Sequence, residues 1–365
     1  ERVSGGGRRQ TGEPRQPRED GRMKPESTED ILELLDGYIV SAALGAAMEL
    51  GVFWRLADRP ASALEMAEAL HIPLNRCQHW LELLLKLGLL ESTPAGYAPT
   101  RLARATILDA QSQHFWAFHA REDRRAFASV LDLPVRLSEP KATPEPPSAA
   151  AWDEYETLQQ DPVYAAGFTR MLYEIHLGLA EQLAGLLDLR GVRRLLDLGG
   201  GSGVVSLALL RKWSGLTSVV MDFGPVCQAG REIAAESGLA DRVTYRAADI
   251  LKDDLPTGFD LIMLCDVGEF DDALFRRIHD ALGAGGRLVV VDKFAPAETT
   301  PPPSRLLGAF LGSLKSPAES IRLTTAAMVQ AQLRAAGFRD FALTAVPPLD
   351  KRRWNADWSV LEALG

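Results

Sequence analysis

Cysteine is scarce in this sequence, and its scarcity excludes several classes of protein. The 365 residues include only Cys77, Cys227 and Cys265. These are too few for a disulfide framework, and no two of them have the close spacing of a zinc site. No cluster of acidic residues and histidines with metal-ligand spacing stands out either. We therefore expect a protein of the reducing cytoplasm that holds no metal.

Long apolar runs and an excess of positive charge are also missing. No apolar run approaches the roughly 20 residues that a helix needs to cross a bilayer. The formal net charge of −9 disfavours general attraction to nucleic acid or anionic membranes, so we expect neither as a partner. Residues 1–25 are rich in Gly, Pro and Arg and lack the apolar core of a secretory signal. We expect them to form a disordered extension outside the fold.

The rest of the chain is long enough for two domains of about 100–200 residues each. Residues 26–137 are dominated by helical periodicity. Within them the segment 38–56, "YIVSAALGAAMELGVFWRL", is apolar nearly all round, which predicts a buried helix. A second subunit is one surface that could bury it, and we expect an obligate homodimer formed through these N-terminal helices.

Residues 60–104 have the pattern of a winged helix-turn-helix. Two short helices are predicted around a turn, and "TPAGYAPT" at 93–100 predicts the hairpin wing. Such a unit can bind DNA, but five basic residues between Ala57 and Arg104 are balanced by five acidic ones. The second helix also carries Trp80 and a run of leucines, which suit packing. We therefore favour a dimerising role, with a DNA-binding regulator as the alternative.

The pattern changes in the second half of the chain. A proline-rich stretch at 138–150 predicts a loop, and residues 151–365 form the second predicted domain. After a helical stretch to about residue 190, short apolar strands alternate with helical segments. That alternation predicts an α/β domain built on a doubly wound parallel sheet.

The first strand of this sheet runs into "LLDLGGGSG" at 195–203. Ligands of open α/β sheets bind at the carboxyl ends of the strands. Gly199, Gly201 and Gly203 allow a tight turn and let a ligand approach the backbone closely. The spacing does not fit the dinucleotide fingerprint G-x-G-x-x-G, and no P-loop lysine follows. We therefore expect a different ligand at this turn.

Acidic residues are predicted at the ends of the next two strands. Asp222 lies 25 residues after Asp197, and an acid there can accept hydrogen bonds from both hydroxyls of a ribose. Asp249 is predicted to end the third strand, where it could hold an adenine amino group with Ile250 against the ring. These positions predict a ligand that contains adenosine.

With these motifs the chain resembles the S-adenosylmethionine (SAM)-dependent methyltransferases. More narrowly, it resembles the dimeric small-molecule O-methyltransferases of plant phenolic and bacterial antibiotic pathways, over about residues 30–365. "LLDLGGGSG" matches their D-x-G-G-G-x-G motif. The resemblance implies a Rossmann-like methyltransferase domain behind an all-helical dimerisation domain with a winged helix. It also implies SAM as cofactor and S-adenosylhomocysteine (SAH) as product. The residues expected to contact the cofactor are Asp197, Gly199, Gly201, Asp222, Asp249, Ile250, Cys265 and Met171.

The sequence departs from the family where the catalytic base is expected. Members of the family carry "L-H-D-W-D-D" or a close variant after the fourth strand, and that histidine removes the acceptor proton. Here the segment reads "MLCDVGEFDD", which puts either Gly268 or Glu269 at the histidine position. We take Glu269 as one candidate base, although a carboxylate there could equally cap the next helix. His119, on a helix expected to wall the acceptor pocket, is the other candidate and could instead be structural.

The expected activity is methyl transfer to a mostly apolar, aromatic small molecule, at oxygen or at carbon. The residues expected to line the acceptor pocket are Trp116, Trp152, Phe168, Met171 and Met328. Because the usual histidine is missing, one alternative is a SAM-binding protein with other chemistry, such as hydroxylation, decarboxylation or a pericyclic reaction. A less favoured alternative is a winged-helix regulator that senses the cofactor.

Overall fold

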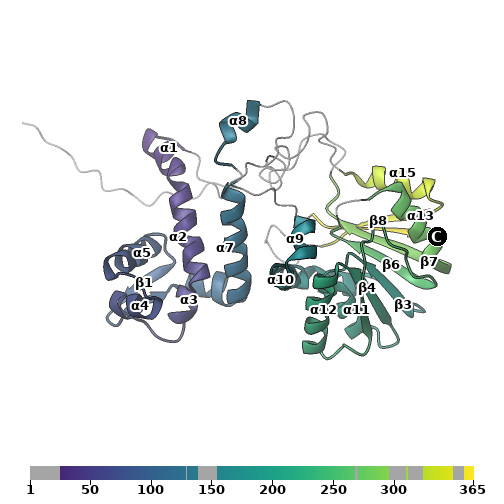
Figure 1. Cartoon of the computed structure of the whole chain (residues 1–365), viewed down its shortest axis with the longest axis horizontal. Coiled ribbons are helices and arrows are strands. Elements are labelled where there is room, and N and C mark those ends of the chain that lie inside the picture. Colours follow the sequence, from purple (N-terminus) through teal and green to yellow (C-terminus); the bar gives the residue numbers. More distant parts are fainter. Residues whose placement is uncertain are drawn as a thin grey trace, which may run out of the picture.

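The computed structural model describes residues 25–128, 130–138, 154–267, 270–295, 310, 324–347 and 357–365. Figure 1 shows a helical half built from the N-terminal residues beside an α/β half built from the C-terminal ones, with α9 and α10 between them. The predicted order of a helical region followed by an α/β region is confirmed.

The apolar N-terminal segment forms three helices. They are α1 (Thr28–Leu35), α2 (Gly37–Glu49) and α3 (Val52–Arg55). The burial expected for residues 38–56 holds only for the later part of that segment. Tyr38 and Ile39 are 55% and 48% exposed, whereas Val52, Phe53 and Leu56 are fully buried. Among the described helices no single one is long and apolar enough to cross a membrane. The pair α1 and α2 passes the same test only when joined, and it is bent by 43°.

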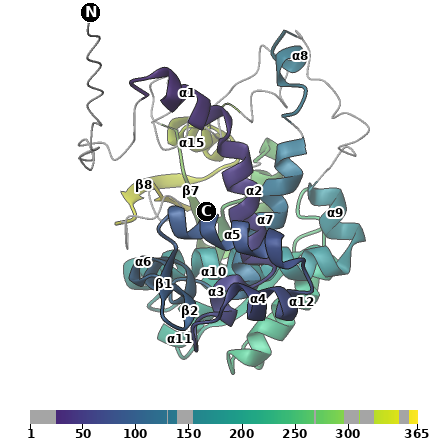
Figure 2. The same cartoon turned by 90° about the vertical axis from the view of Figure 1, so that its left-hand side faces the viewer.

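The winged helix is present as predicted. Ser62 caps α4 together with Glu65, and Leu81 and Leu84 of α5 are buried in the helical core. Further helices follow the wing, and among them α7 packs along α2 (Figure 1). In Figure 2, where the helical half faces the viewer, α1 and α8 extend beyond its other helices. The elements are α4 (Ala63–Leu70), α5 (Leu74–Lys86), β1 (Leu90–Thr93), β2 (Gly96–Pro99), α6 (Arg101–Ala103), a π-helical turn (Arg104–Leu108), α7 (Gln113–Ala128) and α8 (Leu133–Ser138).

The α/β half contains a seven-stranded sheet in the order β5-β4-β3-β6-β7-β9-β8. The first five of these strands are parallel, as predicted. The last two differ from the prediction, because β9 pairs antiparallel with both β7 and β8. The strands are β3 (Arg194–Leu198), β4 (Thr217–Asp222), β5 (Val243–Ala247), β6 (Phe259–Cys265), β7 (Leu282–Asp292), β8 (Arg339–Ala345) and β9 (Ser359–Leu364).

Helices cover both faces of the sheet. Neighbouring residues of a strand point to opposite faces, so Leu195 packs under α10 and α11 while Leu196 packs under α13 and α15. The helices of this half are α9 (Glu154–Gln160), α10 (Pro162–Leu186), α11 (Val204–Lys212), α12 (Gly224–Glu236), α13 (Asp272–Ala281) and α15 (Ala326–Ala335).

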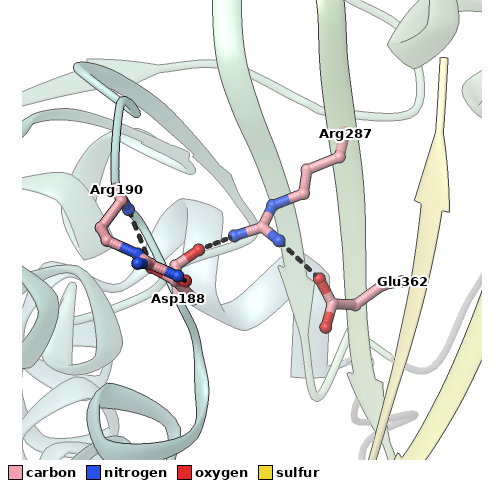
Figure 3. Close-up of polar contacts among 4 residues, drawn as sticks. All are labelled: Asp188, Arg190, Arg287 and Glu362. Atoms are coloured by element: carbon pink, nitrogen blue, oxygen red, sulfur yellow. Dashed lines mark hydrogen bonds and ion pairs between the residues drawn. The ribbon is translucent and has the colours of Figure 1, made fainter.

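A polar network connects the antiparallel strand β9 to the segment that precedes β3 (Figure 3). Arg287 of β7 donates to Glu362 of β9 at 2.8 Å and also to the backbone carbonyl of Asp188. Arg190 in turn donates from Nε to the Asp188 carboxylate at 2.8 Å. These residues lie near the amino ends of the parallel strands, away from the end where a ligand is expected.

Candidate functional site

A cavity of about 560 Å³ opens at the carboxyl ends of the parallel strands. Its volume falls within the roughly 300–1,000 Å³ typical of small-ligand sites. The loops after β3, β4, β5 and β6 form one side, and α9 and α10 form the other. The lining residues are Glu156, Leu158, Gln159, Phe168, Thr169, Leu172, Gly199, Gly201, Ser202, Asp222, Phe223, Val226, Ala248, Asp249, Ile250, Leu251, Lys252, Asp266 and Val267.

The glycine loop between β3 and α11 is held in one shape by its neighbours. Gly199 and Gly201 have φ angles of +64° and +57°, a region that side chains rarely adopt. The Gly201 amide donates to Asp222 Oδ2 at 2.9 Å, so the loop is fixed to the end of β4. At Gly203, a Cβ atom would lie 2.5 Å from the Tyr245 hydroxyl. The loop therefore needs glycine partly for its turn and partly for close packing.

Asp197 lies beneath this loop and not in the cavity wall. Its carboxylate is 1% exposed and accepts a 2.6 Å hydrogen bond from Ser206. Its Oδ1 atom has no hydrogen-bond partner among the described residues. Burial, reinforced by the nearby charge of Asp222, raises the pKa of Asp197 to about 7. The structure thus places Asp197 as a support for the loop.

Asp222 lies at the end of β4, as predicted, and lines the cavity. Its Oδ1 accepts from the Phe223 amide at 2.7 Å, while Oδ2 accepts from Gly201. Burial raises the pKa of Asp222 to about 6, and these two backbone amides act in the opposite direction. A carboxylate can accept about four hydrogen bonds. Two positions thus remain for hydroxyl groups of a ligand.

Asp249 and Ile250 also line the cavity, but Asp249 does not end a strand. Strand β5 ends at Ala247, so Asp249 belongs to the following turn. Its carboxylate accepts from the Leu251 amide at 3.0 Å and pairs with Lys252 Nζ at 2.8 Å. The lysine ammonium holds the pKa of Asp249 below its usual value. Lys252 lines the cavity beside it and was not among the predicted site residues.

The end of β6 brings a further acid to the cavity. Asp266 lines it and lies 3.1 Å from Nε2 of His176 on α10. Val267 reaches the glycine loop, since a Cβ added at Gly199 would lie 3.0 Å from its methyl group. Cys265, which we expected to contact the cofactor, precedes these two residues and is not among those that line the cavity.

Only part of the predicted acceptor wall faces this cavity. Phe168 lines it with Thr169 and Leu172, whereas Met171 is 6% exposed and packs in an aromatic core with Phe115. Around the helix, Thr169 and Leu172 lie on one side of Phe168, and Met171 lies on its other side. The predicted lining role of Met171 is therefore wrong for this cavity.

Trp116, Met328 and His119 do not line the cavity either. The Trp116 indole donates to the Ile107 carbonyl at 3.1 Å, and Met328 of α15 is 42% exposed. His119 stacks on the Phe115 ring, with its Nε2 3.8 Å from Asp123. Trp152, Gly268 and Glu269 lie outside the described residues. Within the part of the chain that the structure covers, no group of three His, Cys, Asp or Glu could hold a metal.

The chain matches two models of known protein families. A model of the O-methyltransferase domain matches residues 147–339, and a model of the O-methyltransferase dimerisation domain matches residues 32–109. Together they span most of both halves, ending where the last two strands of the sheet begin.

Individual relatives are more distant. The 3-hydroxy-5-methyl-1-naphthoate 3-O-methyltransferase of Streptomyces sahachiroi is 29% identical, over 71% of this chain and 75% of that protein. The N,N-dimethyltransferase OxyT of Streptomyces rimosus is also 29% identical, over 74% of this chain and 80% of its own length. Among solved structures, PigF with SAH superposes with a TM-score of 0.77 at 21% identity, over 93% of this chain and all of that one.

Proposed function

The chain belongs to the O-methyltransferase family with an N-terminal dimerisation domain, and we propose that it methylates a mostly apolar, aromatic small molecule. It is a SAM-dependent enzyme, as the resemblance had implied. The observation that carries the proposal is a single cavity in which the glycine loop, Asp222 and Asp249 meet. When bound there, SAM supplies a methyl group whose transfer to a nucleophilic atom leaves SAH.

The residues of the cavity suit this cofactor from one end to the other. Asp222 would accept hydrogen bonds from the ribose hydroxyls, because its fixed carboxylate keeps acceptor positions on the cavity side. Asp249 would accept from the adenine amino group, with Ile250 against the ring. The hydrogen bond from Lys252 lowers the pKa of that carboxyl further below its usual value. Gly199 and Gly201 leave room for the amino-acid part of the cofactor.

The acceptor would lie against the apolar side chains that α9 and α10 contribute. Leu158, Phe168 and Leu172 line the cavity, and Phe223 and Val226 face it from the start of α12. Such a wall favours a flat, apolar molecule. Oxygen is the acceptor atom that the family favours, and carbon remains the second candidate. The relative OxyT is an N,N-dimethyltransferase by name, so nitrogen belongs in the same screen.

We retain Glu269 as the candidate base because it follows Val267, a lining residue, by two positions. His119 is no longer a candidate, because its ring packs on Phe115 outside the cavity.

We further propose that residues 26–137 dimerise through α1 and α2, whose apolar side chains are exposed in the single chain, and that residues 151–365 form the catalytic domain. A cytoplasmic location remains the expectation, since the three cysteines are free.

Two measurements test the proposal. Isothermal titration calorimetry with SAH should show binding to the wild type and at least a tenfold loss in Asp222→Ala, with Glu181→Ala on the exposed face of α10 as the matched control. Incubation with methyl-labelled SAM and a panel of aromatic alcohols, amines and carbon nucleophiles should then move the label. Label that never leaves SAM while SAH binds would favour the non-methylating alternative. A gel shift with DNA at low salt would favour the regulator.

A further inference from the structure

His176 lies on α10 one helical turn after Leu172, a residue that lines the cavity. Phe168 and Leu172 line the cavity, and residues four apart on a helix share a face, so His176 is next in that row. Its imidazole is 12% exposed and its Nε2 lies 3.1 Å from Asp266 Oδ2. The carboxylate of Asp266 is 46% exposed and is the member of the pair that lines the cavity. The histidine thus stands behind an acid that faces the ligand space.

The sheet order tells which part of the ligand this acid faces. The loops that follow β5, β4, β3 and β6 carry, in that order, Asp249, Asp222, the glycine loop and Asp266. Three steps of about 4.8 Å between neighbouring strands span about 14 Å, on the order of the length of an extended adenosyl amino acid. If Asp249 marks the adenine and Asp222 the ribose, Asp266 lies beyond the glycine loop, at the amino-acid end.

The charges at that end select for a cation. Asp266 Oδ1 makes no hydrogen bond within the described residues, and Asp197 and Asp292 add negative charge around the neighbouring Cys265. Lys293, which directly follows β7, lies over the Trp358 ring at 4.5 Å, and the same ring meets His176 edge-on. The carboxylate is therefore held by one histidine and keeps an oxygen for a second donor.

The backbone at Asp266 is built to present this side chain. Its φ of +56° is a conformation that non-glycine residues rarely adopt, and it is kept by the amide of Asp266 donating to the Val291 carbonyl at 2.9 Å. The turn comes directly after the end of β6, where the chain leaves the sheet.

We propose that Asp266 binds the α-ammonium group of the methionine part of SAM and SAH, and that His176 is the positioning residue that orients its carboxylate. The proposal rests on the proposed function, because it assumes SAM in this cavity. It assigns to the α10–β6 contact a role in recognising the amino-acid end of the cofactor, which the sequence motifs do not specify.

Calorimetry with two ligands tests the proposal. SAH carries the α-ammonium group, and 5′-methylthioadenosine lacks the whole amino-acid end. We expect Asp266→Asn to weaken SAH binding by about 10- to 100-fold, the effect of losing one charge-assisted hydrogen bond. Binding of 5′-methylthioadenosine should change less than twofold. His176→Phe should weaken SAH binding about three- to tenfold on the same scale, and His176→Gln, which keeps a donor, should recover part of that loss.

Removing the amino group from the ligand, and not changing the protein, gives a test that does not depend on folding. The SAH analogue without its amino group should bind the wild type as weakly as SAH binds Asp266→Asn, and the variant should not distinguish the two ligands. Equal affinity of the wild type for SAH and this analogue would overturn the proposal, as would equal loss of SAH and 5′-methylthioadenosine in Asp266→Asn. If the wild type binds none of these ligands, it is the proposed function that fails.

Discussion

Gly203 is the position where the structure makes its sharpest demand on the glycine loop. An alanine there would keep a backbone φ of +74°, and its Cβ would lie 2.5 Å from the hydroxyl of Tyr245. Gly238, at the end of α12, provides a matched control. It has a φ of +71°, and nothing lies within 4 Å of the Cβ that an alanine would add. The two substitutions share the conformational cost and differ only in the collision.

The expected costs follow from those two situations. A left-handed alanine costs about 1–2 kcal/mol at either position. At Gly203 the added methyl also displaces the Tyr245 hydroxyl, which is largely buried and donates to the Ser202 carbonyl at 2.8 Å. Losing that bond in a buried place costs about 1–3 kcal/mol more. We therefore expect Gly203→Ala to destabilise the protein by about 2–5 kcal/mol and Gly238→Ala by about 1–2 kcal/mol.

Urea unfolding at one fixed protein concentration measures both costs, and calorimetry with SAH measures the effect on the site. Gly203→Ala should weaken SAH binding, while Gly238→Ala should leave it unchanged. Adding Tyr245→Phe to Gly203→Ala should restore part of the lost stability, because the nearest remaining ring atom is then 3.2 Å away. Equal destabilisation by the two alanines would refute the close packing of the loop on Tyr245.

Three further predictions concern other parts of the molecule. Burial raises the pKa of Asp197 from 3.8 to about 7. The free energy of unfolding that this carboxyl contributes is therefore full below pH 3.8 and is lost as pH rises through 7. Urea unfolding between pH 5.5 and 8 should show this loss of stability, and Asp197→Asn should make the loss smaller. Arg287→Ala removes the contacts with Glu362 and the Asp188 carbonyl, so it should cost about 1–2 kcal/mol in the same assay without changing SAH affinity. Leu35→Glu on α1 should convert the dimer to monomer in light scattering, whereas Leu343→Glu, which is 52% exposed on β8, should not; a dimer that survives the first change would place the interface elsewhere.

The sequence predicts the cofactor side of the cavity because the relevant signals are local. A glycine-rich turn directly after an apolar strand, and an acid at the end of the next strand, need no knowledge of distant contacts to be placed at one edge of a parallel sheet. The structure puts Gly199, Gly201 and Asp222 there, together with Asp249. The direction of a strand is not encoded in its own residues. The antiparallel strands β8 and β9 were therefore not predicted, although β9 contributes the buried side chains of Val360 and Leu361 to the core.

The acceptor side was predicted less well because it depends on helix phase and on tertiary contacts. Met171 and Leu172 are neighbours in the sequence, yet only the second reaches the cavity. His176 and Asp266 are 90 residues apart, and nothing in either segment indicates that they meet. The helical spacing from Leu172 to His176 was the one signal available, and it gains meaning only when Leu172 is known to face the cavity.

Because Asp197 and Asp222 titrate near neutral pH, the charge of the bound cofactor should change the number of protons released on binding. Both carboxyls are buried beside the glycine loop, and burial raises their pKa values to about 7 and about 6. A cation placed over the loop lowers the pKa of nearby acids. Binding of SAM, which carries a sulfonium, should therefore release more protons near pH 6.5 than binding of SAH, whose sulfur is neutral. For each ligand, the number of protons released is the slope of the binding enthalpy against the ionisation enthalpy of the buffer, measured in phosphate and imidazole. Asp197→Asn should reduce the difference between the two slopes. Identical slopes for the two ligands would mean that the sulfonium binds away from these acids, which would remove the electrostatic reason for keeping two buried carboxyls at this turn.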